Sequence, residues 1–320
     1  MTRFYAFNGD ADGLCALQQL RLVDPGDATL VTGVKRDIQL LRRVNAATGD
    51  EVTVLDISLD ANREDLYRLL DAGAAVRYFD HHYAGERPQH RNLEAHIEES
   101  SDVCTSTLVD RHLAGRHRSW AIVAAFGDNL KDRAVAMAQD AGIDTVTAAT
   151  LERLGICLNY NAYGNTVSDL CFDPEDLARQ MLPFVDPMEF VRHSPAFVRL
   201  GACYDEDMQK ARALTPAREV PGATMVMLPD EAWARRAIGV LANELARAQP
   251  DCAIAIVSPN AQGGFTVSVR VPPQHPVAAD EFCRTFPTGG GRSLAAGINQ
   301  LPATELDRFA ASFEAHFRTG

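Results

Sequence analysis

The chain has 320 residues, of which 46% are hydrophobic and 23% charged, and its formal net charge is -12 at pH 7. A chain of this length can bury one large core or two ordinary ones, and two domains are the better expectation. The acidic balance argues against a protein that coats long nucleic acid through a broad basic surface. A short phosphate-bearing ligand is still compatible, because divalent cations bound to carboxylates neutralise the charge locally.

Signals for membranes, secretion and disulfides are absent from the sequence. No apolar run approaches the roughly 20 residues that cross a bilayer, and the N-terminus turns acidic before a signal-peptide core could develop. The seven cysteines stand singly without a CxxC pair, which indicates neither a disulfide framework nor a zinc ribbon. We therefore expect a cytoplasmic protein without membrane association.

The first part of the chain has the pattern of an α/β domain. Helices are expected over residues 14–22 and 63–72, and apolar runs typical of strands cover residues 3–7, 28–32, 52–55, 74–79 and 121–126. Strands that alternate with helices predict a parallel sheet covered by helices on both faces. We assign residues 1–170 to this domain.

The remainder of the chain predicts a connector and a second, smaller α/β domain. Residues 171–216 have a mainly helical pattern broken by prolines, and we assign them to a helical connector. Within residues 217–320, strands are expected at 223–228, 253–258 and 265–271, helices at 233–248 and 304–317, and a glycine-rich loop at 286–291.

Acidic residues follow four of the apolar runs in the first domain. They are Asp10 with Asp12, Asp56, Asp80 and Asp128. In open parallel α/β sheets, ligands bind beyond the carboxyl ends of the strands. The sequence therefore predicts that these carboxylates meet in one crevice.

Each acidic motif also has a simpler interpretation. Asp10 and Asp12 could form a polar turn with a helix N-cap, and Asp56 could cap the next loop. The run Asp80-His81-His82 is more distinctive, because a carboxylate and two imidazoles are costly to bury without partners. Carboxylate and imidazole together favour Mn, Co, Zn or Fe over Mg or Ca. We interpret the set as a dinuclear site that activates water for attack on a phosphorus.

The motifs resemble those of the DHH phosphoesterase superfamily. The run Phe7-Asn8-Gly9-Asp10-Ala11-Asp12-Gly13, then Leu55-Asp56, Asp80-His81-His82 and Gly127-Asp128, occur in the order of its four motifs. Residues 289–297 resemble the GGGHxxAAG signature of its DHHA1 domain. The resemblance is to the branch that holds RecJ-type exonucleases, nanoRNA and pAp phosphatases and cyclic-dinucleotide phosphodiesterases. It implies an N-terminal DHH domain, a C-terminal DHHA1 domain and an active site in the cleft between them.

The resemblance also implies roles for individual residues. Asp10 corresponds to a ligand of the first metal, Asp12, His81 and Asp128 to ligands of the second, and Asp56 to the carboxylate that bridges them. His82 would face the substrate phosphate, with Asp80 orienting the histidine pair. Asn8 stands where RecJ-like members have another aspartate and is a weaker candidate ligand. Two divalent ions are implied, with manganese expected and magnesium or cobalt as alternatives.

Basic and glycine residues of the second domain are candidates for substrate binding. Arg270 resembles the arginine of the family's S-x-R strand, and Arg292 stands where the family has histidine. Backbone N–H groups of Gly289, Gly290 and Gly291 could cradle an anion near a helix start, although a glycine run is more often a flexible loop. The run 104–107 could be a helix N-cap or a phosphate contact.

The sequence thus predicts a hydrolase for a short phosphodiester or nucleotide phosphate, of the nanoRNase, pAp phosphatase or short-oligonucleotide exonuclease type. The expected partner is a nucleotide or short oligonucleotide rather than long duplex DNA. The changes at Asn8 and Arg292 leave an alternative, a catalytically impaired protein that binds nucleotides or regulates. The exact substrate, the choice between monoester and diester, and homodimer formation stay open.

Overall fold

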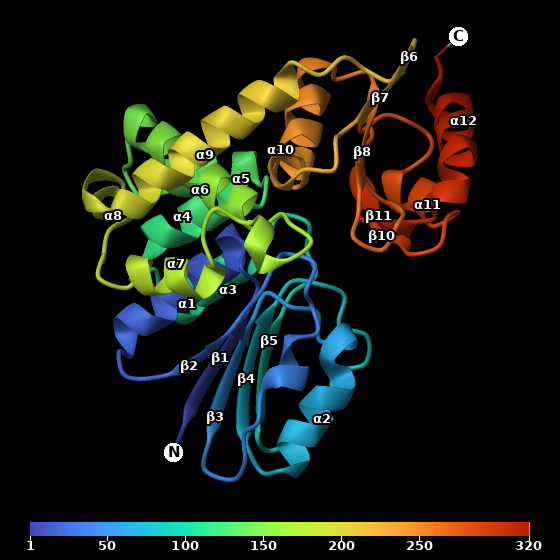
Figure 1. The fold of residues 1–320 in the computed structure, drawn as a ribbon. Coiled ribbons are helices and arrows are strands. Elements are labelled where there is room, and N and C mark those ends of the chain that lie inside the picture. The colour runs from blue at the N-terminus through green and yellow to red at the C-terminus, as the bar shows by residue number, and fades with distance from the viewer. Residues whose placement is uncertain (320) are drawn as a thin grey trace. The chain divides into compact units, whose positions relative to one another are not determined.

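The computed structural model describes residues 1–319, which form two compact units (Figure 1). The first comprises Met1–Ala202 and the second begins at Cys203, so the division falls within helix α9 (Pro195–Arg212). The domain boundaries expected at residues 170 and 216 stay predictions. No helix within residues 1–319 combines the length and the apolar character that a membrane crossing requires.

A five-stranded parallel sheet forms the centre of the first unit. In spatial order its strands are β2 (Thr29–Val31), β1 (Arg3–Phe7), β3 (Glu51–Leu55), β4 (Ala75–Asp80) and β5 (Leu93–Ile97). The parallel sheet expected from the sequence is therefore confirmed. The chain leaves β1 for β2 on one side and then returns to pair β3 on the other. This reversal places a topological switch point between β1 and β3, which is where ligands bind in open α/β sheets.

Helices cover the sheet and continue into a helical layer (Figure 1). The helices of the first unit are α1 (Ala11–Val23), α2 (Arg63–Asp71), α3 (Thr105–His112), α4 (Arg118–Gly127), α5 (Lys131–Asp140), α6 (Thr145–Asn161), α7 (Pro174–Met181), α8 (Pro187–His193) and the start of α9, with short 3-10 turns at η1 (Leu40–Arg43), η2 (Asp60–Asn62) and η3 (Val167–Asp169). Pro174 and Pro187 begin α7 and α8. A proline at the first helical position forgoes an N–H that has no partner within the helix, so these prolines start helices rather than end them.

One element of the first unit differs from its prediction. Residues 121–126 were expected to form a strand, but they belong to α4. Every residue from Trp120 to Gly127 is buried, so this part of the helix has no polar face. A short apolar run of this kind does not distinguish a buried helix from a buried strand. Asp128 therefore follows a helix and not a strand, and the prediction of a strand end at this position was wrong.

The second unit is built on a six-stranded mixed sheet. In spatial order its strands are β10 (Gly289–Gly291), β11 (Ala295–Leu301), β9 (Phe265–Arg270), β8 (Ala253–Pro259), β7 (Ala223–Met227) and β6 (Arg218–Val220). Among the described residues of this sheet, only β7 and β8 pair in parallel, and the other neighbouring strands are antiparallel. The other elements are α10 (Ala232–Ala248), α11 (Ala279–Cys283), η4 (Ala303–Glu305) and α12 (Leu306–Phe317).

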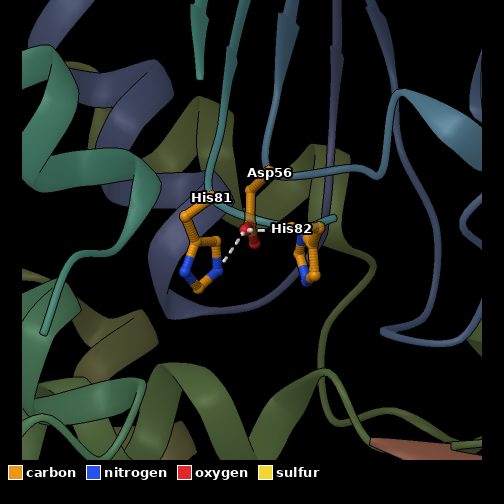
Figure 2. Close-up of side chains that lie close together, drawn as sticks. All are labelled: Asp56, His81 and His82. Carbon is orange, nitrogen blue, oxygen red and sulfur yellow. Dashed lines mark ion pairs between the residues drawn. The ribbon is translucent and has the colours of Figure 1, made fainter. Parts of the chain in front are cut away.

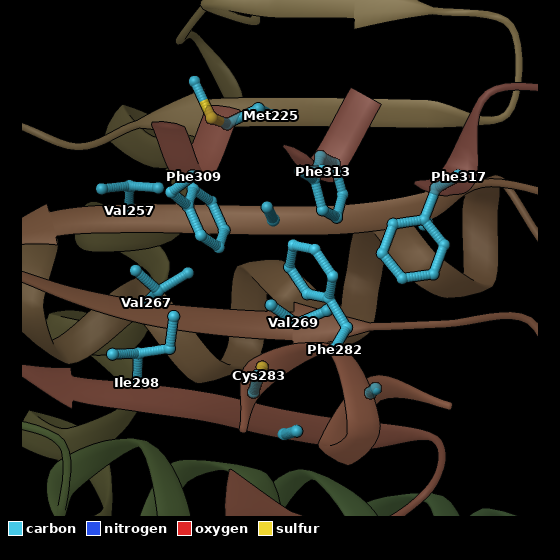
Figure 3. Packing of buried hydrophobic residues seen from close by; sticks show 14 of the residues in the cluster. Met225, Val257, Val267, Val269, Phe282, Cys283, Ile298, Phe309, Phe313 and Phe317 are labelled. Carbon is cyan, nitrogen blue, oxygen red and sulfur yellow. The ribbon is translucent and has the colours of Figure 1, made fainter. Parts of the chain in front are cut away.

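Aromatic side chains dominate the core of the second unit (Figure 3). Phe282 of α11 lies against three phenylalanines of α12, which are Phe309, Phe313 and Phe317. All four side chains are almost fully buried and face valines of the sheet such as Val267 and Val269. Their edge-to-face and tilted ring contacts are the arrangement that aromatic pairs prefer.

The glycine run also differs from its prediction. Gly289, Gly290 and Gly291 form strand β10, which pairs antiparallel with residues 296–298 of β11. The loop expected over residues 286–291 is thus confirmed only for 286–288. The helix start expected beside the glycines was wrong, because β10 turns into β11 and α12 begins only at Leu306. A Cβ atom at Gly289 would lie 1.8 Å from the Cys283 carbonyl oxygen, so the backbone approaches too closely for any other residue.

Candidate metal centre

The turn between β1 and α1 positions the first pair of aspartates. Asp10 is the N-cap of α1, and its Oδ1 accepts hydrogen bonds from the backbone N–H groups of Asp12 (3.0 Å) and Gly13 (3.1 Å). The N-cap interpretation of Asp10 is thus confirmed, and Asp12 lies in the first helical turn. A Cβ atom at Gly13 would be 2.1 Å from the carbonyl oxygen of Asn8, so glycine is required for this tight turn.

Three carboxylates converge on one imidazole nitrogen. His81 Nε2 lies 3.4 Å from Asp56 Oδ1, 3.9 Å from Asp12 Oδ2 and 4.0 Å from Asp128 Oδ2. Asp12, Asp56 and His81 are buried, and the Asp128 side chain is only 17% exposed. Figure 2 shows the Asp56 carboxylate between the rings of His81 and His82. The sequence prediction that these residues from distant segments meet is confirmed by this geometry.

The backbone fixes which nitrogen of His81 faces the carboxylates. Its Nδ1 lies 2.8 Å from the carbonyl oxygen of Val103. A carbonyl only accepts, so Nδ1 carries the proton and Nε2 presents its lone pair in the neutral ring. A lone pair that faces three carboxylates is unfavourable unless a proton or a cation lies among them. These four side chains therefore fit a divalent ion with mixed nitrogen and oxygen ligands.

Asp80 orients the second histidine. Its Oδ1 accepts hydrogen bonds from the N–H groups of His81 (2.9 Å) and His82 (3.2 Å) and lies 2.7 Å from His82 Nδ1. Asp80 is fully buried, whereas the His82 side chain is 41% exposed. The contact leaves His82 Nε2 as the outer nitrogen of the ring. Although burial opposes the charged imidazole, the Asp80 carboxylate raises the pKa of His82 above its usual value.

The N-terminus of α3 binds Asp12. The N–H groups of Thr105 and Ser106 each donate to one oxygen of the Asp12 carboxylate at 2.7 Å, and Ser106 Oγ donates to the Asp12 carbonyl. Thr105 Oγ1 donates to Asp56 Oδ1 at 3.2 Å. A carboxylate at a helix N-terminus is favoured by the helix dipole. Of the two interpretations of residues 104–107, the structure supports the helix start, because these N–H groups already have a carboxylate partner.

Close helix packing brings Asp128 to the same place. A Cβ atom at Gly127 would lie 2.4 Å from the Cβ of Ala11, the residue between Asp10 and Asp12. It would also lie 2.8 Å from the carbonyl oxygen of Gly155 on α6. Helices α1, α4 and α6 therefore meet where there is no room for a larger side chain. Asp128 is the residue after Gly127, so this close contact places it beside the β1–α1 turn.

Lys35 is a site residue that the sequence reasoning missed. It lies in the loop after β2, and its Nζ forms an ion pair with Asp10 Oδ2 and donates to Asn159 Oδ1 at 3.1 Å. Burial alone would lower the Lys35 pKa, but the Asp10 carboxylate raises it well above the ordinary value for lysine. Reciprocally, burial would raise the Asp10 pKa, but Lys35 lowers it below its usual value. A single lysine in a loop carries no motif that could have indicated this role.

The remaining carboxylates repel one another. Burial, followed by the charges of Asp10 and Asp12, raises the pKa of Asp56 well above its usual range. Burial also raises the Asp12 pKa. In the protein without metal, Asp56 and Asp12 thus bind protons more readily than exposed carboxylates do, which is the behaviour expected where a cation would otherwise supply the positive charge.

We expect the stability of the metal-free protein to fall as the pH rises. The folded state holds protons on Asp56 and Asp12 above about pH 4, where the unfolded chain has released them, so each step toward neutral pH favours unfolding. The lowered pKa of Asp10 changes the stability only below about pH 4, where the unfolded chain takes up protons. Melting temperatures measured between about pH 5 and pH 8 in EDTA should therefore decrease, and added Mn²⁺ should remove the decrease. The same pH dependence with and without Mn²⁺ would contradict the metal assignment.

The candidate residues of the second unit have varied partners. Arg270 donates from Nε to Asn243 Oδ1 (2.7 Å) and from Nη1 to Ser268 Oγ (3.0 Å). Arg292 is exposed at the turn between β10 and β11, and its backbone N–H donates to the Ala295 carbonyl. The roles predicted for both arginines in substrate binding stay predictions.

A second group of ligand-type side chains lies at the edge strand β5. Glu94, His96 and His112 place ligand atoms within 4.8 Å of one another. Glu94 already lies 2.6 Å from His96 Nε2 and 3.2 Å from Arg77 Nε. The positive charge of Arg77 neutralises this carboxylate, so we assign no metal to the group.

Comparisons with known proteins agree with this architecture. No protein-family model and no curated protein sequence matched the chain. Among solved structures, exonuclease RecJ bound to manganese superposes with a TM-score of 0.64 at 18% identity, covering 98% of this chain and 89% of that chain. RecJ in complex with Mn²⁺ from Thermus thermophilus gives 0.67 at 19% identity, and this chain spans 51% of its length. The pGpG-specific phosphodiesterase PggH from Vibrio cholerae gives 0.57 at 15% identity, covering 99% of both chains.

The sequence resemblance is thus confirmed at the level of the fold. Both the parallel sheet with its acidic edge and the mixed sheet of the second unit lie within the matched region, which includes nearly all residues of this chain. The chain has the α/β fold of the RecJ-like DHH phosphoesterases.

Proposed function

We propose that the protein is a metal-dependent phosphoesterase that hydrolyses a short phosphodiester or a nucleotide phosphate. The observation that carries the proposal is the placement of His81 Nε2 within 4.0 Å of the Asp12, Asp56 and Asp128 carboxylates at the switch point of the sheet. A divalent ion there would polarise a phosphoryl oxygen and lower the pKa of water. The manganese in the RecJ structures supports manganese as the ion.

The side chains of the first unit support specific tasks in this reaction. Asp12, Asp56, His81 and Asp128 would hold the ion. The half-exposed His82, held by Asp80, would contact the phosphate with its outer nitrogen. Because Asp80 favours the protonated ring, His82 can donate a hydrogen bond to a phosphoryl oxygen or a proton to a leaving group. Asp80 would act through His82 as a positioning residue.

Several features favour a small substrate. The net charge of -12 argues against a broad basic surface for long nucleic acid. Lys35 supplies a positive charge beside Asp10. Its neighbour in sequence, Arg36, has an Nη1 that is buried without a hydrogen-bond partner among the described residues. The pGpG-specific enzyme with the same fold supports a dinucleotide as one candidate. We propose that Arg270, Arg292 and the β10 glycines bind the part of the substrate remote from the reacting phosphorus, and that the protein acts in the cytoplasm.

The ion pair of Lys35 with Asp10 favours a second candidate function. A carboxylate already neutralised by lysine is less available to a metal, and a weakened centre would suit a protein that binds nucleotides without rapid turnover. Under this alternative, a nucleotide would bind with micromolar affinity or better, while Mn²⁺ would not accelerate its hydrolysis.

A substrate panel separates the two. Purified protein with added Mn²⁺ is incubated with pAp, the dinucleotide pGpG, a short RNA, a cyclic dinucleotide and pyrophosphate, and products are resolved by chromatography. We expect hydrolysis of at least one nucleotide that EDTA abolishes. Binding of a nucleotide with no hydrolysis of any compound would reject the phosphoesterase in favour of the binding protein.

Arg292→Ala tests the part assigned to the second unit. A remote anion contact holds the ground state and the transition state equally, so its loss should raise KM about tenfold and leave kcat unchanged. Arg247→Ala, at an exposed arginine of α10, is the matched control and should change neither. A fall in kcat at constant KM would instead show that Arg292 acts in the chemical step.

A further inference from the structure

Two residues beside Asp10 determine whether a metal ion can bind there. Asn8 stands where the RecJ-like pattern has an acidic residue, and Lys35 places its ammonium on Asp10 Oδ2. The Asn8 amide nitrogen also donates to the Lys35 backbone carbonyl at 3.4 Å. An aspartate at position 8 could not donate this hydrogen bond, because its side chain has no N–H group. The Asn8 amide therefore helps to hold the backbone of Lys35 beside Asp10.

Lys35 is held in this position by several contacts. Its backbone N–H donates to the Ala162 carbonyl at 2.9 Å, and its Nζ donates to Asn159 Oδ1 and lies 5.7 Å from the centre of the Tyr163 ring. The side chain is only 26% exposed. An ammonium with a carboxylate, an amide oxygen and an aromatic ring around it has the surroundings of a bound cation.

The oxygens of Asp10 are already occupied. Oδ1 accepts two N–H groups of the first turn of α1, and Oδ2 pairs with Lys35. Asn8 adds only a neutral amide oxygen. A divalent ion on this side would lie beside the Lys35 ammonium and be repelled by it. On the other side, His81 Nε2 lies 3.4–4.0 Å from carboxylate oxygens of Asp12, Asp56 and Asp128. The ion pair of Lys35 is with Asp10, and among the described residues no lysine forms an ion pair with Asp12 or Asp56.

We infer that the Lys35 ammonium takes the place of one of the two cations, so that the centre holds a single divalent ion on Asp12, Asp56, His81 and Asp128. The inference rests on the proposed function for the role of the ion, but it concerns the number of ions and can be tested without turnover. The donor set beside Asp10 does not fit a second divalent ion, whereas His81 Nε2 and the three carboxylates around it fit one.

The test counts ions. Protein stripped with EDTA is reloaded with Mn²⁺, and bound metal is measured by native mass spectrometry and by electron paramagnetic resonance, in which an isolated Mn²⁺ differs from an exchange-coupled pair. We expect one Mn²⁺ per wild-type chain with the signal of an isolated ion. Two ions per chain with a coupled signal, or no bound ion, would overturn the inference.

A designed variant tests the cause. Asn8→Asp combined with Lys35→Met restores the acidic residue, removes the ammonium and keeps most of the apolar stem, and it should bind two Mn²⁺ with a coupled signal. Lys131→Met, at a surface lysine paired with Glu152, is the control and should bind one. A double variant that folds by circular dichroism and still binds one ion would show that the ammonium does not exclude the second. If the variant does not fold, the wild-type count still decides.

The count and the activity fail independently. Mn²⁺-dependent hydrolysis by a chain that binds two ions would overturn the inference and leave the phosphoesterase in place. One bound ion without hydrolysis of any substrate would support the inference and reject the phosphoesterase.

Discussion

Replacing Asp56 by asparagine is expected to lower metal-dependent hydrolysis by about 10³-fold or more. The proposed ion would lose the charged ligand nearest to His81 Nε2, and the phosphoryl oxygen would lose the positive charge that polarises it. The same change should raise the melting temperature of the metal-free protein. Asp56 is buried beside Asp10 and Asp12, and the removal of its charge relieves their repulsion. Loss of activity together with a gain in metal-free stability would show that Asp56 serves the reaction and not the stability of the fold.

The backbone of Asp56 makes asparagine the right replacement. Asp56 has φ of 58°, in the left-handed region where Asp and Asn are tolerated better than other non-glycine residues. Asparagine therefore preserves the conformation, whereas alanine would add backbone strain. Initial rates with Mn²⁺ and thermal melts with EDTA are the measurements, and Asp71→Asn, at an exposed carboxylate of α2, is the control. Near-wild-type turnover in Asp56→Asn would rule out the proposed metal centre.

Asp12→Ala is expected to cost both activity and stability. Asp12 accepts the backbone N–H groups of Thr105 and Ser106, and its truncation leaves two buried donors at the start of α3 without an acceptor. Each unsatisfied donor costs about 1–3 kcal/mol, so the free energy of unfolding should fall by at least this amount. Hydrolysis should be lost as well, because the same carboxylate is a ligand of the proposed ion.

Graded variants separate the two roles of Asp12. Asp12→Asn keeps one carbonyl oxygen for α3 but removes the charge, so it should recover part of the stability and little of the activity. Chemical denaturation with EDTA present measures the first, and initial rates measure the second. Ser106→Ala removes only the hydroxyl bond to the Asp12 carbonyl and serves as a mild control. Equal stability of Asp12→Ala and wild type would show that α3 does not depend on this carboxylate.

The sequence allowed much of the first unit to be predicted, because its signals are local. Residues 75–78 of strand β4 alternate between exposed and buried, and Asp10 precedes a helix that it caps. Since the carboxyl ends of parallel strands share one edge of a sheet, the meeting of Asp56 with His81 followed from these local patterns. The left-handed backbone of Asp56 has no such signal, because aspartate is common in ordinary loops.

The failures have equally physical causes. Helix α4 was taken for a strand because its buried run has no polar face, and β10 was taken for a loop because a strand of three glycines has no side chains to alternate. Lys35 was missed because the reach of a long side chain depends on where its loop is placed. The hydrogen bonds that tie this loop to Asn8 and Ala162 exist only in the folded chain.

The glycine contact between α1, α4 and α6 has a consequence for how this centre can change. A Cβ atom at Gly155 would lie 2.2 Å from the Val123 carbonyl oxygen, just as one at Gly127 would strike Ala11. The distance between Asp12 and Asp128 is therefore set by the thickness of a helix interface rather than by a flexible loop. Random mutagenesis should accordingly find inactive variants at small residues that never touch substrate or ion, and second-site changes that shrink a neighbouring side chain should restore them.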